Sequence, residues 1–259
     1  MKKVKKSECK MYKDLNHPDI VPFCFLTVGH WLQGNIGQDR KDIGMLIQTF
    51  CSVFKDKPKD EQPGLILKTS TAGFSIGDRG DITKKIKGIT DTFGDTCPPV
   101  YLVFGDLSEE DMNNMYNHPK VKSMVMFTKG EGYGRPLAEF ATTGKPIIVS
   151  KWSGHTDFLP EKNTVYLPGK LTPIDESAVN KFILKEASWF TTNYTVAANQ
   201  MMNVHKQYNE FSKQSKGLQS NIRKNFSMSK MTEKFGEILD RHKVAPEKIE
   251  LKLPQIQKL

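Results

Sequence analysis

Residues 123–139 read SMVMFTKGEGYGRPLAE, in which an apolar run is followed by three glycines and a proline. The apolar run has no polar alternation, which is typical of a β-strand buried on both faces of a parallel sheet. Pro136 suits the first turn of a helix, and Gly144 suits a helix end. This stretch therefore predicts a buried strand, a glycine-rich turn and a short helix, in that order.

Four other short apolar runs lie before and after this stretch, with helical periodicity between them. Ser108 and Asp111 begin one of these helices in the manner of a capping box. The predicted strands are 23–28, 65–67, 100–104, 123–127 and 146–149, and the predicted helices are 43–54, 81–89, 108–117 and 136–143. The alternation predicts an α/β fold, a Rossmann-like doubly wound parallel sheet with helices on both faces.

The rest of the chain is expected to form a helical C-terminal extension. From Asp175 onward the sequence is amphipathic, with expected helix breaks near Thr191 and Gly217. No Gly/Ser-rich or proline-rich linker divides the chain. We distinguish four parts: a basic N-terminal segment (1–20), a Rossmann-like domain (21–190), C-terminal helices (191–242) and a basic tail (243–259).

The chain has 259 residues, 38 of them basic and 29 acidic, so its formal net charge is +9. This composition excludes a disordered chain, a collagen-like repeat and a small disulfide-rich scaffold. Residues 1–13 carry +5 and residues 243–259 carry +2, so only +2 remains for the body. The basic ends either keep the chain soluble or bind nucleic acid or an anionic surface.

Several kinds of protein are disfavoured by what the sequence lacks. No apolar run approaches the roughly 20 residues of a membrane-spanning helix, and no apolar segment follows the basic N-terminus as in a secretion signal. We therefore expect a cytoplasmic location. The four cysteines lie far apart without a Cys-x-x-Cys pair, so we expect reduced thiols and no zinc site.

Two loops follow predicted strands at the edge of the sheet where doubly wound folds bind ligands. The first runs from Gly29 to Arg40 and Lys41, and these two cations beside the N–H groups of a helix start suit a pyrophosphate. The second, residues 105–108, suits a nucleobase through backbone hydrogen bonds. A solvated basic pair and an ordinary strand-to-helix turn are the alternative interpretations.

The glycine-rich turn of the opening stretch is a third such loop, and Glu131 and Glu139 lie on either side of it. Glycines allow a ligand to approach the backbone closely, and a helix start offers N–H donors to an anion. Carboxylates repel phosphate and accept hydrogen bonds from hydroxyl groups. A nucleotide-sugar has phosphates for the N–H groups and a ribose and a hexose for the two glutamates. The alternative is a glycine-rich turn with two solvated glutamates.

Residues 131–139 (EGYGRPLAE), followed by GKPIIV at 144–149 and SGHTD at 153–157, resemble the Glu-x7-Glu signature of retaining glycosyltransferases with two Rossmann-like domains, the GT-B fold. The resemblance extends from about Phe23 to about Leu239. It implies the C-terminal, donor-binding half of a GT-B fold. A partner protein with the acceptor domain, or a homo-oligomer, would then supply the other half.

The resemblance implies catalytic roles for Glu131, Arg40 and Lys41, with the two cations on the diphosphate and Glu131 on the donor sugar. Glu139 would bind the ribose. The other implied donor-binding residues are Gly29, His30, Gly105, Leu107, Gly132, Tyr133, Gly134 and Arg135. No metal or other cofactor is implied, because the cations neutralise the phosphates. The family often has arginine at His30 and glycine at Asp42, so Arg40 would replace the missing cation.

The function implied is transfer of a sugar, with retention of anomeric configuration, from a nucleotide-sugar such as UDP-glucose. We rank nucleic acid ahead of a membrane lipid as the acceptor. A non-catalytic nucleotide-sugar-binding or scaffold subunit is the alternative. A dinucleotide oxidoreductase is disfavoured because no Gly-x-Gly-x-x-Gly follows the first strand. His155 is interpreted as a structural loop histidine and not as a catalytic base.

Overall fold

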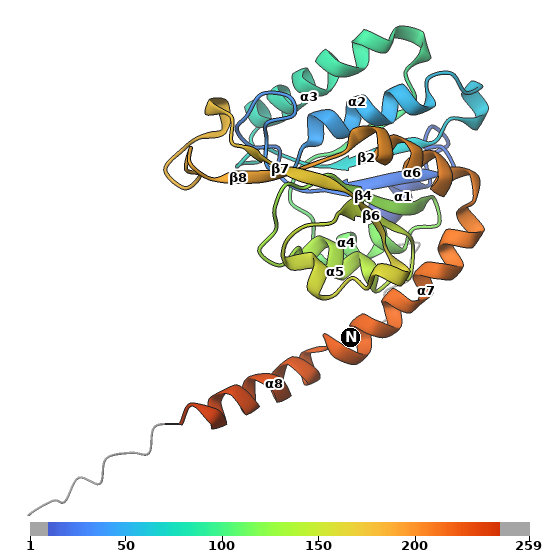
Figure 1. Ribbon diagram of the computed structural model, residues 1–259. Helices are drawn as coiled ribbons and strands as arrows, with labels where there is room; N and C mark the ends of the chain where they lie inside the picture. The colour runs from blue at the N-terminus through green and yellow to red at the C-terminus, as the bar shows by residue number, and fades with distance from the viewer. Residues whose placement is uncertain (1–9, 244–259) are drawn as a thin grey trace, which may run out of the picture.

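Six parallel strands form the centre of the computed structural model, which describes residues 10–243 (Figure 1). Their order across the sheet is β3-β2-β1-β4-β5-β6, and each neighbouring pair is parallel. The strands are β1 Cys24–Val28, β2 Gly64–Lys68, β3 Val100–Val103, β4 Val121–Met126, β5 Ile147–Ser150 and β6 Val165–Leu167. This order confirms the predicted doubly wound Rossmann-like sheet.

Helices cover both faces of the sheet and give each face its own apolar core. One face is covered by α2 (Ile43–Phe54), α3 (Ile76–Thr90) and α6 (Tyr194–Lys206). The other is covered by α1 (Lys10–Leu15), α4 (Glu109–Asn117), α5 (Arg135–Ala141) and α7 (Tyr208–Asn225). The last helix, α8 (Met228–Arg241), continues from α7 away from the sheet and has no buried residue (Figure 1).

The five predicted strands are confirmed to within two residues at each end. The sequence analysis missed β6, whose three residues are too short for a periodic signal. The predicted helix 81–89 begins earlier than expected, because Ser75 and Asp78 form a capping box ahead of it.

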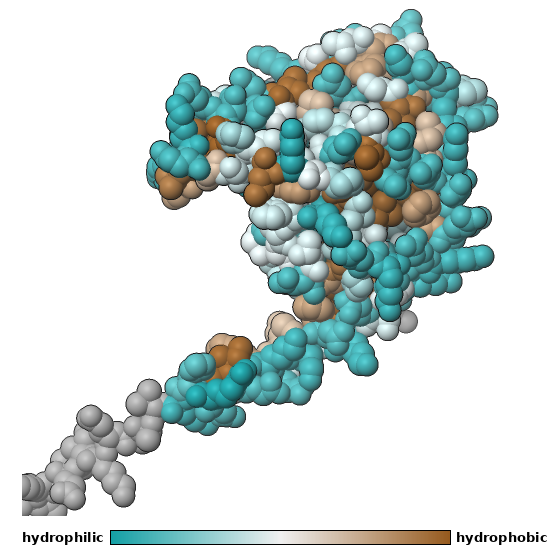
Figure 2. All heavy atoms as spheres, viewed as in Figure 1, coloured by the Kyte–Doolittle hydropathy of each residue, from teal (hydrophilic) through white to brown (hydrophobic). Residues whose placement is uncertain are grey.

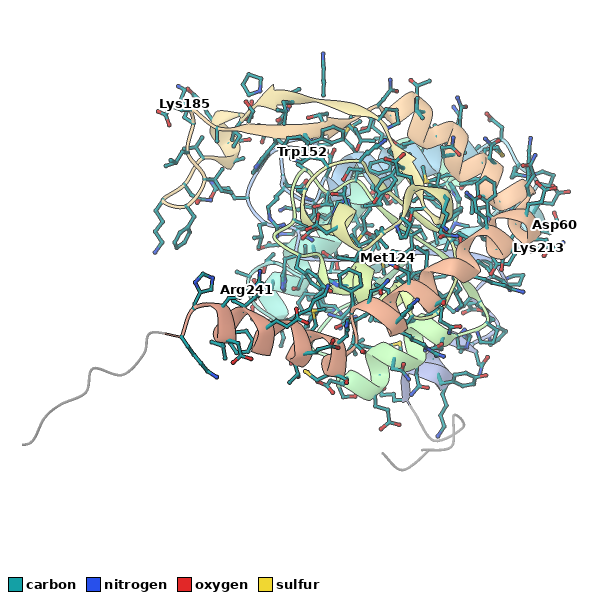
Figure 3. The ribbon with its side chains drawn as sticks, turned by 60° about the horizontal axis from the view of Figure 1, so that its bottom comes forward. Asp60, Met124, Trp152, Lys185, Lys213 and Arg241 are labelled. Atoms are coloured by element: carbon teal, nitrogen blue, oxygen red, sulfur yellow. The ribbon has the colours of Figure 1, made fainter. Side chains whose placement is uncertain are left out.

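The predicted helix after Asp175 is wrong. Residues 169–192 instead contain an antiparallel hairpin, β7 (Gly169–Pro173) with β8 (Ser188–Thr192). Aromatic and β-branched residues fill β8, and the ring of Phe190 stacks on Trp152 with centroids 5.8 Å apart. Figure 3 labels Trp152, which lies beside the hairpin.

The predicted helix break at Gly217 is also wrong, because α7 passes through this residue without interruption. Gly217 serves packing instead: a Cβ there would lie 2.5 Å from the amide nitrogen of Asn163. The break falls at Gln207, between α6 and α7.

The N-terminal segment is part of the folded body from Lys10 onward. Met11 and Leu15 of α1 are buried in the core on the α4 face. Residues 1–9 and 244–259, which hold most of the charge of the predicted basic ends, lie outside the described residues. None of the helices within 10–243 is long and apolar enough to cross a membrane.

Candidate functional site

The order of the strands creates a crevice between β1 and β4. The loop after β1 (29–42) leads to α2 on one face, whereas the loop after β4 (127–134) leads to α5 on the opposite face. In doubly wound sheets this topological switch point is where ligands bind. Both loops hold residues that the sequence predicts to be functional.

Two cations from the first loop meet Glu131 from the second. Lys41 Nζ donates to Glu131 Oε1, and Arg40 Nη1 lies 3.5 Å from Glu131 Oε2. Thr128 Oγ1 also donates to Oε1, at 2.7 Å. The Lys41 and Glu131 side chains are each 8% exposed. Burial raises the pKa of Glu131, but Lys41 and Thr128 outweigh it and hold the pKa below its ordinary value.

Lys41 lies directly over the backbone of the first strand's end. A Cβ at Gly29 would lie 3.0 Å from Cε of Lys41, so glycine leaves room for this side chain. Burial lowers the pKa of Lys41, and Glu131 opposes that shift. Because Arg40 adds a second cation to a single carboxylate, the cluster carries one net positive charge at the crevice.

The start of α2 differs from the prediction. Free N–H groups were expected there for a pyrophosphate, but the buried carboxylate of Asp39 accepts from the N–H groups of Lys41 at 3.1 Å and Ile43 at 3.4 Å. Burial and the neighbouring Asp42 raise the pKa of Asp39 to about 6. The first loop can therefore bind an anion through the side chains of Arg40 and Lys41. The N–H groups of Lys41 and Ile43 at the start of α2 already donate to Asp39.

The glycine-rich turn rests on the SGHTD segment. A Cβ at Gly154 would lie 1.9 Å from the carbonyl oxygen of Gly132, so only glycine fits there. Ser153 Oγ accepts from the N–H of Glu131 at 2.8 Å, and the Gly154 N–H donates to the Glu131 carbonyl at 3.1 Å. Gly134 has φ +86°, which explains the glycine before α5.

His155 lies beneath this turn and is fully buried. Its Nε2–H donates to the carbonyl oxygen of Ser150 at 2.7 Å, and burial lowers its pKa. A neutral, buried histidine held by the backbone agrees with the structural role predicted for it.

Glu139 lies on α5 at the outer end of the same region and is more exposed than Glu131. Tyr116 Oη donates to its Oε2 at 3.0 Å, and Arg135 Nε lies 3.2 Å from its Oε1. The Glu139 side chain is 39% exposed, against 8% for Glu131.

A cavity of about 1010 Å³ runs between these two ends. The predicted site residues along its lining are Gly29, His30, Arg40, Lys41, Leu107, Arg135 and Glu139. The predicted residues outside its lining are Gly105, Glu131, Gly132, Tyr133 and Gly134. Glu131 contacts Lys41, which lines the cavity. The ring of Tyr133 packs on Phe158, with ring centroids 4.8 Å apart.

The end of β2 and the loop after it add cavity residues that were not identified from the sequence pattern. Lys68 Nζ donates to the carbonyl oxygen of Gly105 at 2.8 Å and fixes the predicted nucleobase loop. His30 Nδ1 lies 2.9 Å from Ser70 Oγ, and Phe74, 44% exposed, also lines the cavity. Because this loop also follows the carboxyl end of a strand, its position was the available signal.

A second cavity, of about 1320 Å³, lies along the outer edge of β3. It is larger and shares Asp106 and Leu107 with the first cavity, but neither Lys41 nor Glu131 lines it. Within residues 10–243, no group of three or more His, Cys, Asp or Glu side chains is arranged to hold a metal ion.

No protein-family model matches the sequence, and no curated protein matches it. Solved structures do share the fold. The C-terminal domain of a glycosyl transferase group 1 family protein from Francisella tularensis is 11% identical with a TM-score of 0.59, and the match covers 84% of this chain and 92% of that one.

Two longer structures match over about half of their own length. Sucrose-phosphate synthase from Thermosynechococcus elongatus is 18% identical with a TM-score of 0.59, covering 89% of this chain and 48% of that one. Anabaena HepE, solved in complex with UDP-glucose, is 12% identical with a TM-score of 0.54, covering 85% and 49%. At these identities the likeness shows the fold alone.

Proposed function

We propose that this chain, which has the fold of the C-terminal half of a GT-B glycosyltransferase, binds a nucleotide-sugar in the cavity at the switch point and takes part in transfer of the sugar. The observation that carries the proposal is the meeting of Lys41 and Arg40 with Glu131 between β1 and β4. Positive charge collects there at the edge of the sheet where ligands bind.

In this proposal the diphosphate competes with Glu131 for Lys41 and Arg40. The two phosphates bring more negative charge than one carboxylate, so both cations turn to them. Glu131 is then released to accept hydrogen bonds from the sugar hydroxyls, while Glu139 accepts from the ribose at the outer end. The loop of Gly105 and Leu107 is proposed to hold the base.

The same cations suit the chemical step. As the bond between the anomeric carbon and the phosphate breaks, charge builds on the leaving diphosphate, and Lys41 and Arg40 stabilise it. We further propose retention: the acceptor hydroxyl attacks the anomeric carbon from the face from which the diphosphate departs and passes its proton to the departing phosphate oxygen, so no protein nucleophile is needed. We propose UDP-glucose as donor. We propose no metal, because Lys41 and Arg40 balance the two negative charges of its diphosphate.

No residue within 10–243 identifies the acceptor. A nucleic acid acceptor, a partner with the acceptor domain or a second copy of this chain, and a cytoplasmic location stay predictions. A non-catalytic nucleotide-sugar-binding subunit is the second candidate. It is favoured by the position of Glu131, which lies buried behind Lys41 and does not line the cavity where the sugar would react.

Calorimetric titration of the full chain with UDP-glucose, UDP, ADP-glucose and GDP-mannose tests donor binding. Glu139→Ala should weaken UDP binding about tenfold, the effect of removing a hydrogen bond to a charged group. Glu161→Ala, an exposed glutamate paired with Lys151, should leave it unchanged. Release of UDP from UDP-glucose by the full chain would then show catalysis, which a binding subunit lacks. Absence of binding by every nucleotide-sugar would contradict the proposal.

A further inference from the structure

A second ion pair lies behind the first, beneath the two loops of the switch point. Lys129 Nζ is 3.2 Å from Asp42 Oδ2, and the two side chains are 2% and 0% exposed. Neither residue lines the cavity. Each is nevertheless a near neighbour in sequence of the residues that meet there: Asp42 follows Lys41, and Lys129 precedes Glu131 by two positions.

Asp42 adopts a left-handed conformation, with φ +53° and ψ +36°, at the N-cap of α2. Aspartate is among the few residues other than glycine that accept this region. Its side chain makes no capping hydrogen bond to the helix. The carboxylate turns instead to Lys129 and to Tyr194, whose Oη donates to Oδ2 at 2.7 Å. This explains why Asp42 stands where glycine was expected.

Lys129 connects three elements through its backbone and its side chain. Its N–H donates to the carbonyl oxygen of Arg40 at 2.8 Å, and its carbonyl accepts from the Phe190 N–H of β8 at 3.2 Å. Its Nζ also donates to Thr191 Oγ1 at 3.3 Å. The hairpin and the start of α6 are therefore bonded to both loops of the switch point.

We propose that Asp42, Lys129 and Tyr194 are positioning residues that hold Arg40 and Lys41 at the diphosphate end of the donor site. The inference rests on the proposed function of that site. The pair fixes the backbone of the first loop against the second, so the two cations keep the spacing that a diphosphate requires. A small displacement of such groups is costly to binding.

The stability role of a buried ion pair has to be separated from a positioning role. Removing Lys129 alone leaves a buried carboxylate without its cation, which destabilises any fold. The double variant Asp42→Gly/Lys129→Met removes both charges, and glycine accepts the left-handed conformation without strain. This variant should unfold close to the wild-type Tm, whereas Lys129→Met alone unfolds at a lower temperature.

The decisive comparison uses UDP and uridine, titrated calorimetrically into the full chain. We expect the double variant to bind UDP about tenfold more weakly than wild type and uridine equally well, because only the diphosphate end is displaced. Tyr194→Phe, which keeps the ring, should weaken UDP binding about threefold. Lys185→Met, which breaks an exposed pair with Glu176 in the same hairpin, should change neither ligand.

Equal UDP affinity in wild type, the double variant and Tyr194→Phe would overturn the positioning role. A parallel loss of UDP and uridine affinity would overturn it too, because that marks a general structural defect. If the double variant does not fold, the ratio of UDP to uridine affinity in Tyr194→Phe decides. Absence of UDP binding in wild type would instead contradict the proposed function itself.

Discussion

Glu131 and Glu139 are separated by seven residues in the sequence, yet their carboxylates lie in different surroundings, one buried and one exposed. At the inner end Glu131 is buried beside Lys41 and Arg40. At the outer end Glu139 is more than a third exposed, next to Tyr116 and Arg135. Glu131 lies at the topological switch point, where both loops shield it, whereas Glu139 lies on the open side of a short helix.

An unpaired charge is therefore costly at the buried inner end and costs little at the exposed outer end. In a buried site the two charges attract each other strongly because little water screens them, and removal of one partner leaves the other uncompensated. Exposed pairs are screened by solvent and contribute little.

Lys41→Met should lower the free energy of unfolding by about 3 kcal/mol, because Glu131 then stays buried with Arg40 alone to balance it. Arg135→Met breaks the 3.2 Å pair with Glu139 at the outer end, where Arg135 is 85% exposed. It should cost less than about 1 kcal/mol. Urea unfolding measures the free energy of unfolding of both variants. Equal losses in Lys41→Met and Arg135→Met would contradict the distinction between a buried and an exposed end.

The inner end should also make stability depend on pH through Asp39, whose pKa in the folded chain is raised to about 6. The folded state holds this proton more tightly than the unfolded state. The resulting stabilisation is present below the ordinary carboxyl pKa and is lost as pH rises through about 6.

Relative to Asp39→Asn, wild type should therefore lose about 2 kcal/mol of stability between about pH 4 and pH 7. Urea unfolding of the two proteins at several pH values gives the difference directly. A difference that stays constant with pH would show that Asp39 does not titrate as the geometry requires.

The two glutamates should respond differently to ligands. Glu131→Gln frees Lys41, so UDP should bind at least as well as to wild type, while the additional affinity for UDP-glucose over UDP disappears. Glu139→Gln should weaken UDP and UDP-glucose alike, each about tenfold. Calorimetric titration with both ligands tests this, and a uniform effect of the two substitutions would argue against separate sugar and ribose ends.

Tyr116→Phe should produce the smallest change. It removes the hydroxyl that donates to Glu139 at 3.0 Å and keeps the ring, which packs on Phe140 with centroids 5.8 Å apart. UDP affinity should fall about threefold, with the free energy of unfolding within about 1 kcal/mol of wild type. A loss larger than that of Glu139→Gln would mean that Tyr116 contacts the ligand itself.

Much of the fold could be predicted from the sequence because the first five strands are continuous apolar runs separated by segments of helical periodicity. The hairpin could not, since the short β8 lies next to charged residues such as Lys185 and Glu186, and the alternation there resembles a helix. What stabilises β8 is its stacking on Trp152, a tertiary contact. In the same way β6 owes its place to pairing with β5.

In the candidate site, too, the positions of the loops could be predicted from the sequence, whereas some side-chain contacts could not. The loops could be predicted because the carboxyl ends of parallel strands converge, and this brings Lys41 to Glu131. The carboxylate of Asp39 at the start of α2, and the pairing of Asp42 with Lys129, depend on side-chain directions that spacing does not encode. The sequence pattern likewise could not show that apolar residues of α8 such as Phe235 are exposed. They are exposed because this helix projects from the body (Figures 1 and 2).

In the proposed function the nucleotide binds in the smaller cavity, at the switch point, and not in the larger one along β3. Amide chemical shifts of the isotope-labelled full chain, followed during titration with UDP, test this directly. UDP should cause saturable shifts in the loops at 29–42, 69–75 and 127–136, each of which supplies residues to the smaller cavity and none to the larger one. The loop before α4 lines both cavities and does not discriminate between them. Shifts concentrated in α3 and along β3, or none at all, would contradict binding in the smaller cavity.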